Sequence, residues 1–206
     1  MFNYTYSLPF DTTCIYSQKL LEQLEKINQK FNNTIDIEII KDAITFIRRY
    51  HAGQMRKSGE PFYSHPLEVA SLVASYLTKT EVIITAILHD VVEDTQISSY
   101  MIKYFWGPNI SSLVEMLTDL NDSIKKLKPD KGILLYKKIK TFDKEASLIK
   151  VCDRLHNMRT LGSMKKEKQK KKSLETLQIY VLMARGLGLS DLANELEGLS
   201  RKILSN

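Results

Sequence analysis

The stretch TAILHDVVEDT, from Thr85 to Thr95, places four ionisable residues inside an apolar segment. The three residues before Thr85 are also apolar or β-branched, so the segment has the density of a helix buried in a protein interior. An unpaired carboxylate is costly in such a place, so it finds a partner or binds a metal ion. The sequence therefore predicts a partnered polar cluster formed by His89, Asp90, Glu93 and Asp94.

Helical geometry predicts how this cluster is arranged. A single helix from about residue 79 to residue 94 would place residues four apart on nearly one face. His89 would then lie beside Glu93, and Asp90 beside Asp94. A divalent cation bound to this strip would neutralise the carboxylates and use the imidazole as a ligand, although further ligands must come from elsewhere in the chain.

Few residues can complete such a metal site, because the chain has only four histidines. His65 is a good candidate, since Pro66 fixes the backbone beside it at the expected start of a helix. Asp153 interrupts the apolar pattern of LIKVCDRLHNMRTL, and Asn157 follows one turn later on the same face. A site made of His65, His89, Asp90 and Asp153 has mixed nitrogen and oxygen donors, which suit Mn, Fe or Zn better than calcium.

Such a metal could activate water and polarise a phosphoryl oxygen, and Glu93 and Asp94 are placed to orient that water or move protons. The alternative is a strip of solvated or ion-paired side chains. His51 and His156 are interpreted as structural histidines. The six lysines between residues 165 and 172 are typical of a solvated helix start, with attraction of an anion as the alternative.

Composition predicts an all-α protein. The chain has 206 residues, of which 43% are hydrophobic, with 8 Gly and 5 Pro, and it lacks long alternating β-branched runs. We expect about ten helices in a single bundle, with a lead-in and helix over residues 1–35 and one domain over residues 36–206. The helices are expected near residues 17–31, 36–53, 66–77, 79–94, 98–106, 109–120, 143–161, 173–189 and 190–204, with another resuming near residue 133 after a loop from Asn121 to Gly132.

Charge and cysteine content bound the partners and the compartment. The net charge of +6 and the pI of about 9.1 favour anionic partners such as nucleotides. Cys14 and Cys152 lie far apart, which favours a reducing compartment over a disulfide framework. The first ten residues lack the pattern of a signal peptide and no apolar run is long enough to span a membrane, so a cytoplasmic protein is expected.

Three motifs together resemble a known family. HAGQMRKSGEPFYSHPLEVA, ILHDVVEDT and IKVCDRLHNMRTL are similar, in this order and separation, to the HD-type hydrolase domain of the RelA/SpoT alarmone enzymes. The later SLETLQIYVLMARGLGL extends the similarity, which runs from about Asp36 to Leu199. The resemblance implies an all-helical HD domain that removes the 3′-pyrophosphate from ppGpp or pppGpp, leaving GDP or GTP. It also implies one Mn²⁺ per chain, with Fe²⁺ or Zn²⁺ as alternatives.

The resemblance also implies roles for individual residues. His65, His89, Asp90 and Asp153 match the metal ligands, and Glu93 and Asp94 match the catalytic acidic pair. The substrate-binding residues would be Arg56, Lys57, Ser58, Asn157 and Thr160. The chain reads TDL at residues 118–120, as in the small hydrolase-only branch, and Lys125 is then the counterpart of its phosphate-contacting lysine. YVLMARGLGL departs from the usual YAPLAHRLGI, which bears on packing near the last helices.

Nothing in the sequence resembles a synthetase domain, so a stand-alone hydrolase is expected. The alternatives are that the chain is a fragment of a longer protein or that it works with a separate synthetase. Membrane and nucleic-acid partners are not expected. Two other functions stay open: an HD phosphohydrolase acting on another nucleotide, and a catalytically silent module that senses alarmone or contacts RNA through the lysine run. The presence of every expected ligand and acidic residue argues against the silent module.

Overall fold

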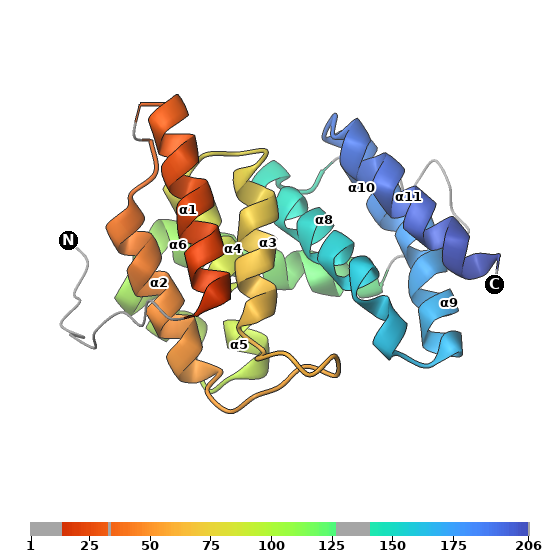
Figure 1. Cartoon of the computed structure of the whole chain (residues 1–206), viewed down its shortest axis with the longest axis horizontal. Helices are drawn as coiled ribbons and strands as arrows, with labels where there is room; N and C mark the ends of the chain where they lie inside the picture. The colour runs from red at the N-terminus through yellow and green to blue at the C-terminus, as the bar shows by residue number, and fades with distance from the viewer. Residues whose placement is uncertain (1–13, 33, 127–140, 206) are drawn as a thin grey trace. The chain divides into compact units, whose positions relative to one another are not determined.

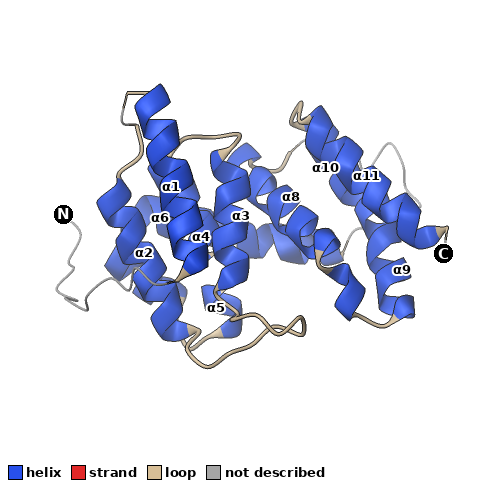
Figure 2. Cartoon of the chain, viewed as in Figure 1, coloured by secondary structure: helices blue, strands red, loops and turns tan. Residues whose placement is uncertain are grey.

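The computed structural model describes residues 14–32, 34–126 and 141–205 of the chain (Figure 1). Regular structure in these residues is helical, with one isolated antiparallel bridge between Met55 and Pro61, which confirms the all-α class (Figure 2). The chain divides into two compact units, Met1–Glu115 and Met116–Asn206. No helix within the described ranges combines the length and apolarity needed to cross a bilayer.

The first unit is built around α4, which packs against α3 and α2, while α1 lies beside α3 (Figure 1). Residues 82 to 88 of α4 are all buried, as the apolar density of the segment predicts. A helix that is apolar on every side can be covered only by other helices. Its helices are α1 (Ile15–Lys30), α2 (Ile37–Tyr50), α3 (Ser64–Ala74), α4 (Thr80–Leu88), α5 (Val91–Asp94) and the first part of α6 (Ser99–Lys125).

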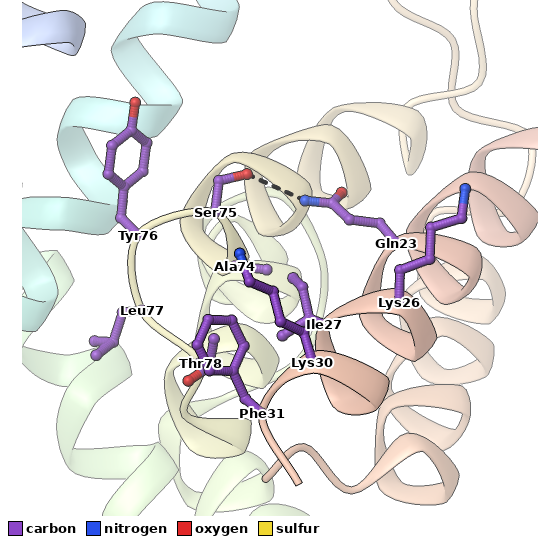
Figure 3. Close-up of a pocket in the computed structure, with 10 residues that line it drawn as sticks. All are labelled: Gln23, Lys26, Ile27, Lys30, Phe31, Ala74, Ser75, Tyr76, Leu77 and Thr78. Carbon is purple, nitrogen blue, oxygen red and sulfur yellow. Dashed lines mark hydrogen bonds between the residues drawn. The ribbon is translucent and has the colours of Figure 1, made fainter. Parts of the chain in front are cut away.

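Polar side chains fix the ends and contacts of these helices. The Asp36 carboxylate caps α2 by accepting hydrogen bonds from the backbone N–H groups of Glu38 and Ile39. Gln23 of α1 joins α1 to α3, because its Nε2 donates to the carbonyl of Ser71 at 3.0 Å. The same Nε2 donates to Oγ of Ser75 at 3.1 Å (Figure 3). These bonds set the register of α1 on the helix that carries His65.

The expected continuous helix from residue 79 to residue 94 is wrong, because α4 ends at Leu88 and α5 begins at Val91. In a continuous helix the carbonyl of Ala86 would pair with the amide of Asp90. Here that carbonyl lies 2.7 Å from Nδ1 of His89. His89 and Asp90 therefore lie in a turn between α4 and α5. They do not share one continuous helix with Glu93 and Asp94, contrary to the prediction from the sequence.

Other helix boundaries also differ from the prediction. α3 begins at Ser64, so His65 lies in its first turn rather than at its cap. The expected helices at 98–106 and 109–120 are joined in α6, which bends at Gly107 (φ 78°) and continues to Lys125, beyond the expected loop start at residue 121. The helix expected to resume near residue 133 lies outside the described residues.

The second unit contains a cluster of C-terminal helices in which α11 packs against α8, α9 and α10 (Figure 1). The Asp143 carboxylate caps α8 through the amide of Ala146, and Arg159 makes a two-pronged ion pair with Glu195 of α11. YVLMARGLGL runs from the end of a π-helical turn into α10. The elements are α8 (Lys144–Arg159), η2 (Leu161–Ser163), α9 (Lys166–Glu175), the π-helical turn η3 (Thr176–Tyr180), α10 (Val181–Gly186) and α11 (Ser190–Leu204).

Candidate metal and nucleotide site

Two imidazoles in the first unit converge on one carboxylate. Nε2 of His89 lies 3.1 Å from one oxygen of Asp90, and Nε2 of His65 lies 3.5 Å from the other. The two rings meet edge to face, with centroids 5.2 Å apart. One ligand atom from each of the three residues lies within 4.8 Å of the other two, close enough for all three to bind one metal ion.

The donor chemistry of this cluster fits a divalent transition metal. The hydrogen bond between Nδ1 of His89 and the carbonyl of Ala86 requires the proton to be on Nδ1. In the neutral form of the ring, Nε2 then presents its lone pair toward Asp90, which is the arrangement of a histidine that binds metal through Nε2. Both histidines are buried and Asp90 is partly exposed, so solvent and a substrate can reach the oxygen side of the cluster.

The fourth expected ligand, Asp153, lies on α8 in the second unit. Its carboxylate accepts a hydrogen bond from Nδ2 of Asn157 at 2.5 Å and lies 3.2 Å from Nζ of Lys150. The predicted placement of Asp153 and Asn157 on one face of a helix is therefore confirmed, and the structure adds a hydrogen bond between them. The convergence of Asp153 with His65, His89 and Asp90 stays a prediction.

The acidic pair follows the cluster directly. Glu93 and Asp94 are exposed on α5, whose single turn is closed by hydrogen bonds from both of their amides to the carbonyl of Asp90. Partial burial and the charge of Asp90 raise the pKa of Asp94, whereas nearby His51 acts in the opposite direction. A carboxyl group with a raised pKa beside a metal cluster is suited to accept and release a proton.

Arg56, Lys57 and Ser58 lie on a short loop that folds back on itself. The amide of Arg56 bonds to the carbonyl of Glu60 at 2.8 Å, and the amide of Gly59 bonds to the carbonyl of Arg56 at 3.0 Å. Gly59 has φ of 92°, a conformation that favours glycine. Ser58 Oγ donates to a carboxylate oxygen of Glu60 at 3.1 Å. The three side chains expected to hold substrate are therefore presented together by a turn with its own backbone bonds.

The remaining predicted substrate residues lie in the second unit. Asn157 donates a hydrogen bond to Asp153, while the hydroxyl of Thr160 donates to the carbonyl of His156 at 3.1 Å. Lys125 is exposed near the end of α6 and pairs with Asp122 at 3.2 Å. Their common role around a nucleotide stays a prediction.

The structure largely agrees with the interpretation of the other basic residues. Five of the six lysines of the run are exposed at the start of α9, as expected for a solvated helix start. Lys172 is the exception, because it is partly buried. This burial, together with the charge of Arg154, lowers the pKa of Lys172. His51 is fully buried and stacks on Phe62 with ring centroids 4.7 Å apart. His156 is half-buried in the last turn of α8.

A cavity of about 600 Å³ opens between the C-terminal ends of α1 and α3 (Figure 3). Its wall combines the aliphatic and aromatic side chains of Ile27, Phe31 and Leu77 with the ammonium-bearing chains of Lys26 and Lys30. None of the predicted metal, acidic or substrate residues lines it. The cavity is therefore separate from the candidate site.

Sequence reasoning missed one polar residue of this region, Gln54. Its side chain contacts both the ring of His51 and the backbone of Asp94. In the sequence it is one more polar residue in a loop rich in turn formers, and no spacing rule distinguishes it. Only the folded chain brings residues 40 positions apart into contact.

Comparison with known proteins places this site in a family. The HD domain family model matches residues 43–190. A guanosine-3′,5′-bis(diphosphate) 3′-pyrophosphohydrolase of Haemophilus influenzae is 38% identical over 74% of this chain and 23% of the relative. The bifunctional (p)ppGpp synthase/hydrolase SpoT of Escherichia coli K12 is 34% identical over 90% of this chain and 27% of the relative. The chain thus spans about a quarter of the length of these curated relatives.

Solved structures show the same fold. A metazoan ortholog of SpoT, described as hydrolysing ppGpp, aligns with a TM-score of 0.61 at 24% identity, over 78% of this chain and 93% of that protein. A protein of Listeria monocytogenes EGD-e aligns with a TM-score of 0.50 at 26% identity, over 70% and 98% of the two chains. The chain therefore belongs to the HD domain family, and its similarity to SpoT confirms the RelA/SpoT resemblance carried by its three motifs.

Proposed function

We propose that this chain is a metal-dependent hydrolase that removes the 3′-pyrophosphate from ppGpp or pppGpp. Water is the second substrate, and the products are GDP or GTP together with pyrophosphate. The observation that carries the proposal is the convergence of two buried imidazoles on the Asp90 carboxylate. The printed activities of the Haemophilus influenzae and Escherichia coli relatives support the choice of substrate.

In this proposal His65, His89 and Asp90 hold a single divalent ion together with Asp153. Two imidazole and two carboxylate ligands suit Mn²⁺, Fe²⁺ or Zn²⁺. Of these, the resemblance to the RelA/SpoT hydrolase domain favours Mn²⁺. The bound ion would lower the pKa of a water molecule bound to it and polarise a phosphoryl oxygen. The protein's own contribution is to fix the ligands: α3 carries His65 in its first turn, and the hydrogen bond to Ala86 orients the ring of His89.

The acidic pair handles protons in the proposed reaction. Glu93 and Asp94 follow Asp90 by one turn, and this proximity supports a role in moving protons to and from water on an ion held by Asp90. The raised pKa of Asp94 brings it closer to the range in which a carboxylate can accept a proton from water and pass it on.

The loop and the second unit would hold the nucleotide. Arg56 has a planar cation that can stack on a purine, and Lys57 offers a compact charge for phosphate. Ser58, Asn157, Thr160 and Lys125 complete the proposed contacts. A cytoplasmic location is part of the proposal, because both cysteines are free thiols, as expected in a reducing compartment.

The test is a hydrolysis assay with purified ppGpp, in which pyrophosphate release is measured after chelation and again after adding Mn²⁺. We expect activity to disappear on chelation, return with Mn²⁺, and fall by at least about a thousandfold in His89→Ala, because the water-activating ion is lost. His156→Ala is the matched control, since His156 is a histidine outside the proposed ligand set. Circular dichroism would verify that both variants are folded.

Each outcome has a defined meaning. A metal-loaded protein that leaves ppGpp intact but hydrolyses another nucleotide in a panel would refute the substrate and keep the metal site. Activity that is indifferent to chelation, or equal in His89→Ala and the parent protein, would refute the metal centre. A folded, metal-loaded chain that binds ppGpp without turnover would establish the silent sensing module instead.

A further inference from the structure

Gln54 lies where the substrate loop, the buried His51 and the acidic helix meet. Its Nε2 donates to the backbone carbonyl of Asp94 at 3.3 Å, and its Oε1 lies 2.8 Å from Nδ1 of His51. Its backbone takes part as well, since its amide bonds to the carbonyl of His51 at 3.1 Å and its carbonyl accepts from the amide of Phe62 at 2.9 Å. The backbone of Gln54 thus bonds to His51 before the loop and to Phe62 at its end, and its side chain contacts α5.

The chemistry of these bonds fixes the orientation of both side chains. A carbonyl oxygen can only accept, so the Gln54 atom facing Asp94 is the NH₂ group and the atom facing His51 is the amide oxygen. Nδ1 of His51 must then carry a proton and donate it. The ring of His51 is held in place by Phe62, on which it stacks at an interplanar angle of 25°. Gln54 is therefore aimed by a rigid, buried group.

Neither of the joined elements is expected to hold its position alone. α5 has only four residues, far below the length at which an isolated helix is stable in water. The carbonyl of Asp94 lies at its C-terminal end, where backbone acceptors lack helical partners. The loop from residue 54 to residue 62 exposes most of its middle. A bond between them limits the movement of each relative to the other.

We propose that Gln54 is a positioning residue that couples the loop carrying Arg56, Lys57 and Ser58 to the acidic pair on α5. The catalytic meaning of this coupling rests on the proposed function, because the loop would hold the nucleotide and the pair would handle its protons. His51 acts through Gln54 by keeping the amide in the orientation that reaches Asp94.

Two variants of similar size separate the two side-chain bonds of Gln54. Gln54→Glu keeps an acceptor for His51 but sets a carboxylate against the carbonyl of Asp94, so only the bond to α5 is lost. Gln54→Met removes both bonds. Gln23→Met is the matched control, because Gln23 also joins two elements of the first unit through its Nε2 but lies beside the separate cavity (Figure 3).

The first readout is amide hydrogen exchange, which does not depend on activity. The amides of Glu93 and Asp94 are protected by their bonds to the carbonyl of Asp90. We expect both Gln54 variants to speed their exchange about five- to tenfold, as for the loss of one net hydrogen bond. Gln23→Met should leave these two amides unchanged.

The second readout is the steady-state kinetics of ppGpp hydrolysis with Mn²⁺ content verified. We expect both Gln54 variants to lose about ten- to a hundredfold in kcat, the scale of a small misplacement of catalytic groups, with a smaller change in KM. A merely structural role would lower the melting temperature and leave kcat per folded molecule unchanged.

The outcomes separate this coupling from the proposed function. If Gln54→Glu behaves like the parent protein while Gln54→Met does not, the bond to Asp94 has no role and the coupling is refuted. Unchanged exchange at residues 93 and 94 in both variants would also refute it. If the parent protein does not hydrolyse ppGpp, the proposed function fails, and the exchange experiment alone still decides whether Gln54 couples the loop to α5.

Discussion

The Asp90 carboxylate lies between two imidazole nitrogens, and its position could be predicted only in part. The sequence indicates that an acidic residue in so apolar a segment needs a partner, and His65 was a candidate because of the proline beside it. The tautomer of His89 could not be predicted, because it depends on a side chain turning back to the carbonyl of Ala86. Patterns of residue type predict which groups meet, whereas hydrogen bonds decide which atoms face each other.

Asp94 illustrates a conflict between stability and the role proposed for it. Its pKa is raised, so the ionised form is less favourable in the folded protein than in the unfolded chain. At neutral pH the charge therefore costs stability, and this cost disappears as the pH falls below the unfolded pKa of about 3.9. Asp94→Asn should thus melt at a slightly higher temperature at pH 7. The gain in the free energy of unfolding should be less than about 1 kcal/mol, because solvent screens an exposed group.

The same variant should lose most of its ppGpp hydrolysis, since an amide cannot accept the proton. Thermal denaturation of chelated protein between pH 4 and pH 8 measures the first effect, and the assay with Mn²⁺ measures the second. A lower melting temperature of Asp94→Asn at pH 7, or a stability gain that grows on acidification, would contradict the argument.

The two cysteines should differ in reactivity. Burial raises the pKa of Cys152 to about 12, so its thiolate fraction at pH 8 is on the order of 10⁻⁴. Burial acts on Cys14 too, but hydrogen bonds with Ser17 and Tyr63 leave its pKa below the usual value. Alkylation of the native protein, followed by peptide mass spectrometry, should modify Cys14 first and Cys152 only after denaturation. Equal labelling of both in the native state would contradict this expectation.

At the scale of elements, the helices were predicted more successfully than their ends. Buried α4 follows directly from the run of apolar residues around Ile84. Its end at Leu88 was not predicted, because helical spacing continues through the acidic residues and only the bond made by His89 marks the break. The opposite error occurs in α6, where the residues between Asn121 and Lys125 are polar enough to resemble a loop yet remain helical.

The bend in α6 provides a test of backbone conformation. Gly107 has φ of 78° and ψ of 173°, which is strained for any residue with a Cβ. Gly107→Ala should therefore lower the free energy of unfolding by about 1–3 kcal/mol.

Gly198, in the interior of α11 and with open space around its Cβ position, is the matched control. Gly198→Ala should raise the free energy of unfolding by about 0.5–1 kcal/mol, because it reduces the freedom of the unfolded chain. Urea unfolding of both variants measures the difference. The same sign for both substitutions would show that the bend carries no strain.

At the scale of the whole molecule, the family resemblance predicts contacts between distant segments that helical spacing cannot predict. Spacing within one helix predicts that Asp153 and Asn157 share a face, and the hydrogen bond between them on α8 agrees with this prediction. Its assignment to the same metal as His65 and His89 came from the donor set and from the family resemblance. A pattern of a few residues cannot predict the spatial distance between segments that lie about 60 to 90 residues apart in the sequence.

Metal affinity tests that assignment. If Asp153 is a ligand, Asp153→Asn should weaken Mn²⁺ binding at least about tenfold, as Asp90→Asn should, because each loses an anionic donor. Asp119→Asn, an exposed aspartate of α6, serves as the control. Isothermal titration with Mn²⁺ gives the affinities, and the rise in melting temperature with Mn²⁺ should shrink in parallel. Parent-like affinity in Asp153→Asn would exclude this residue from the ligand set.

The loop from residue 54 to residue 62 also bears on how such proteins diversify. Its turn is maintained by main-chain bonds and by Gly59, which depend little on neighbouring side-chain identity. Arg56, Lys57 and Ser58 can therefore be substituted together without disturbing the hydrophobic interior. If this loop binds the nucleotide as proposed, substitutions at these three adjacent positions would change nucleotide preference while the buried histidines of the metal cluster stay the same.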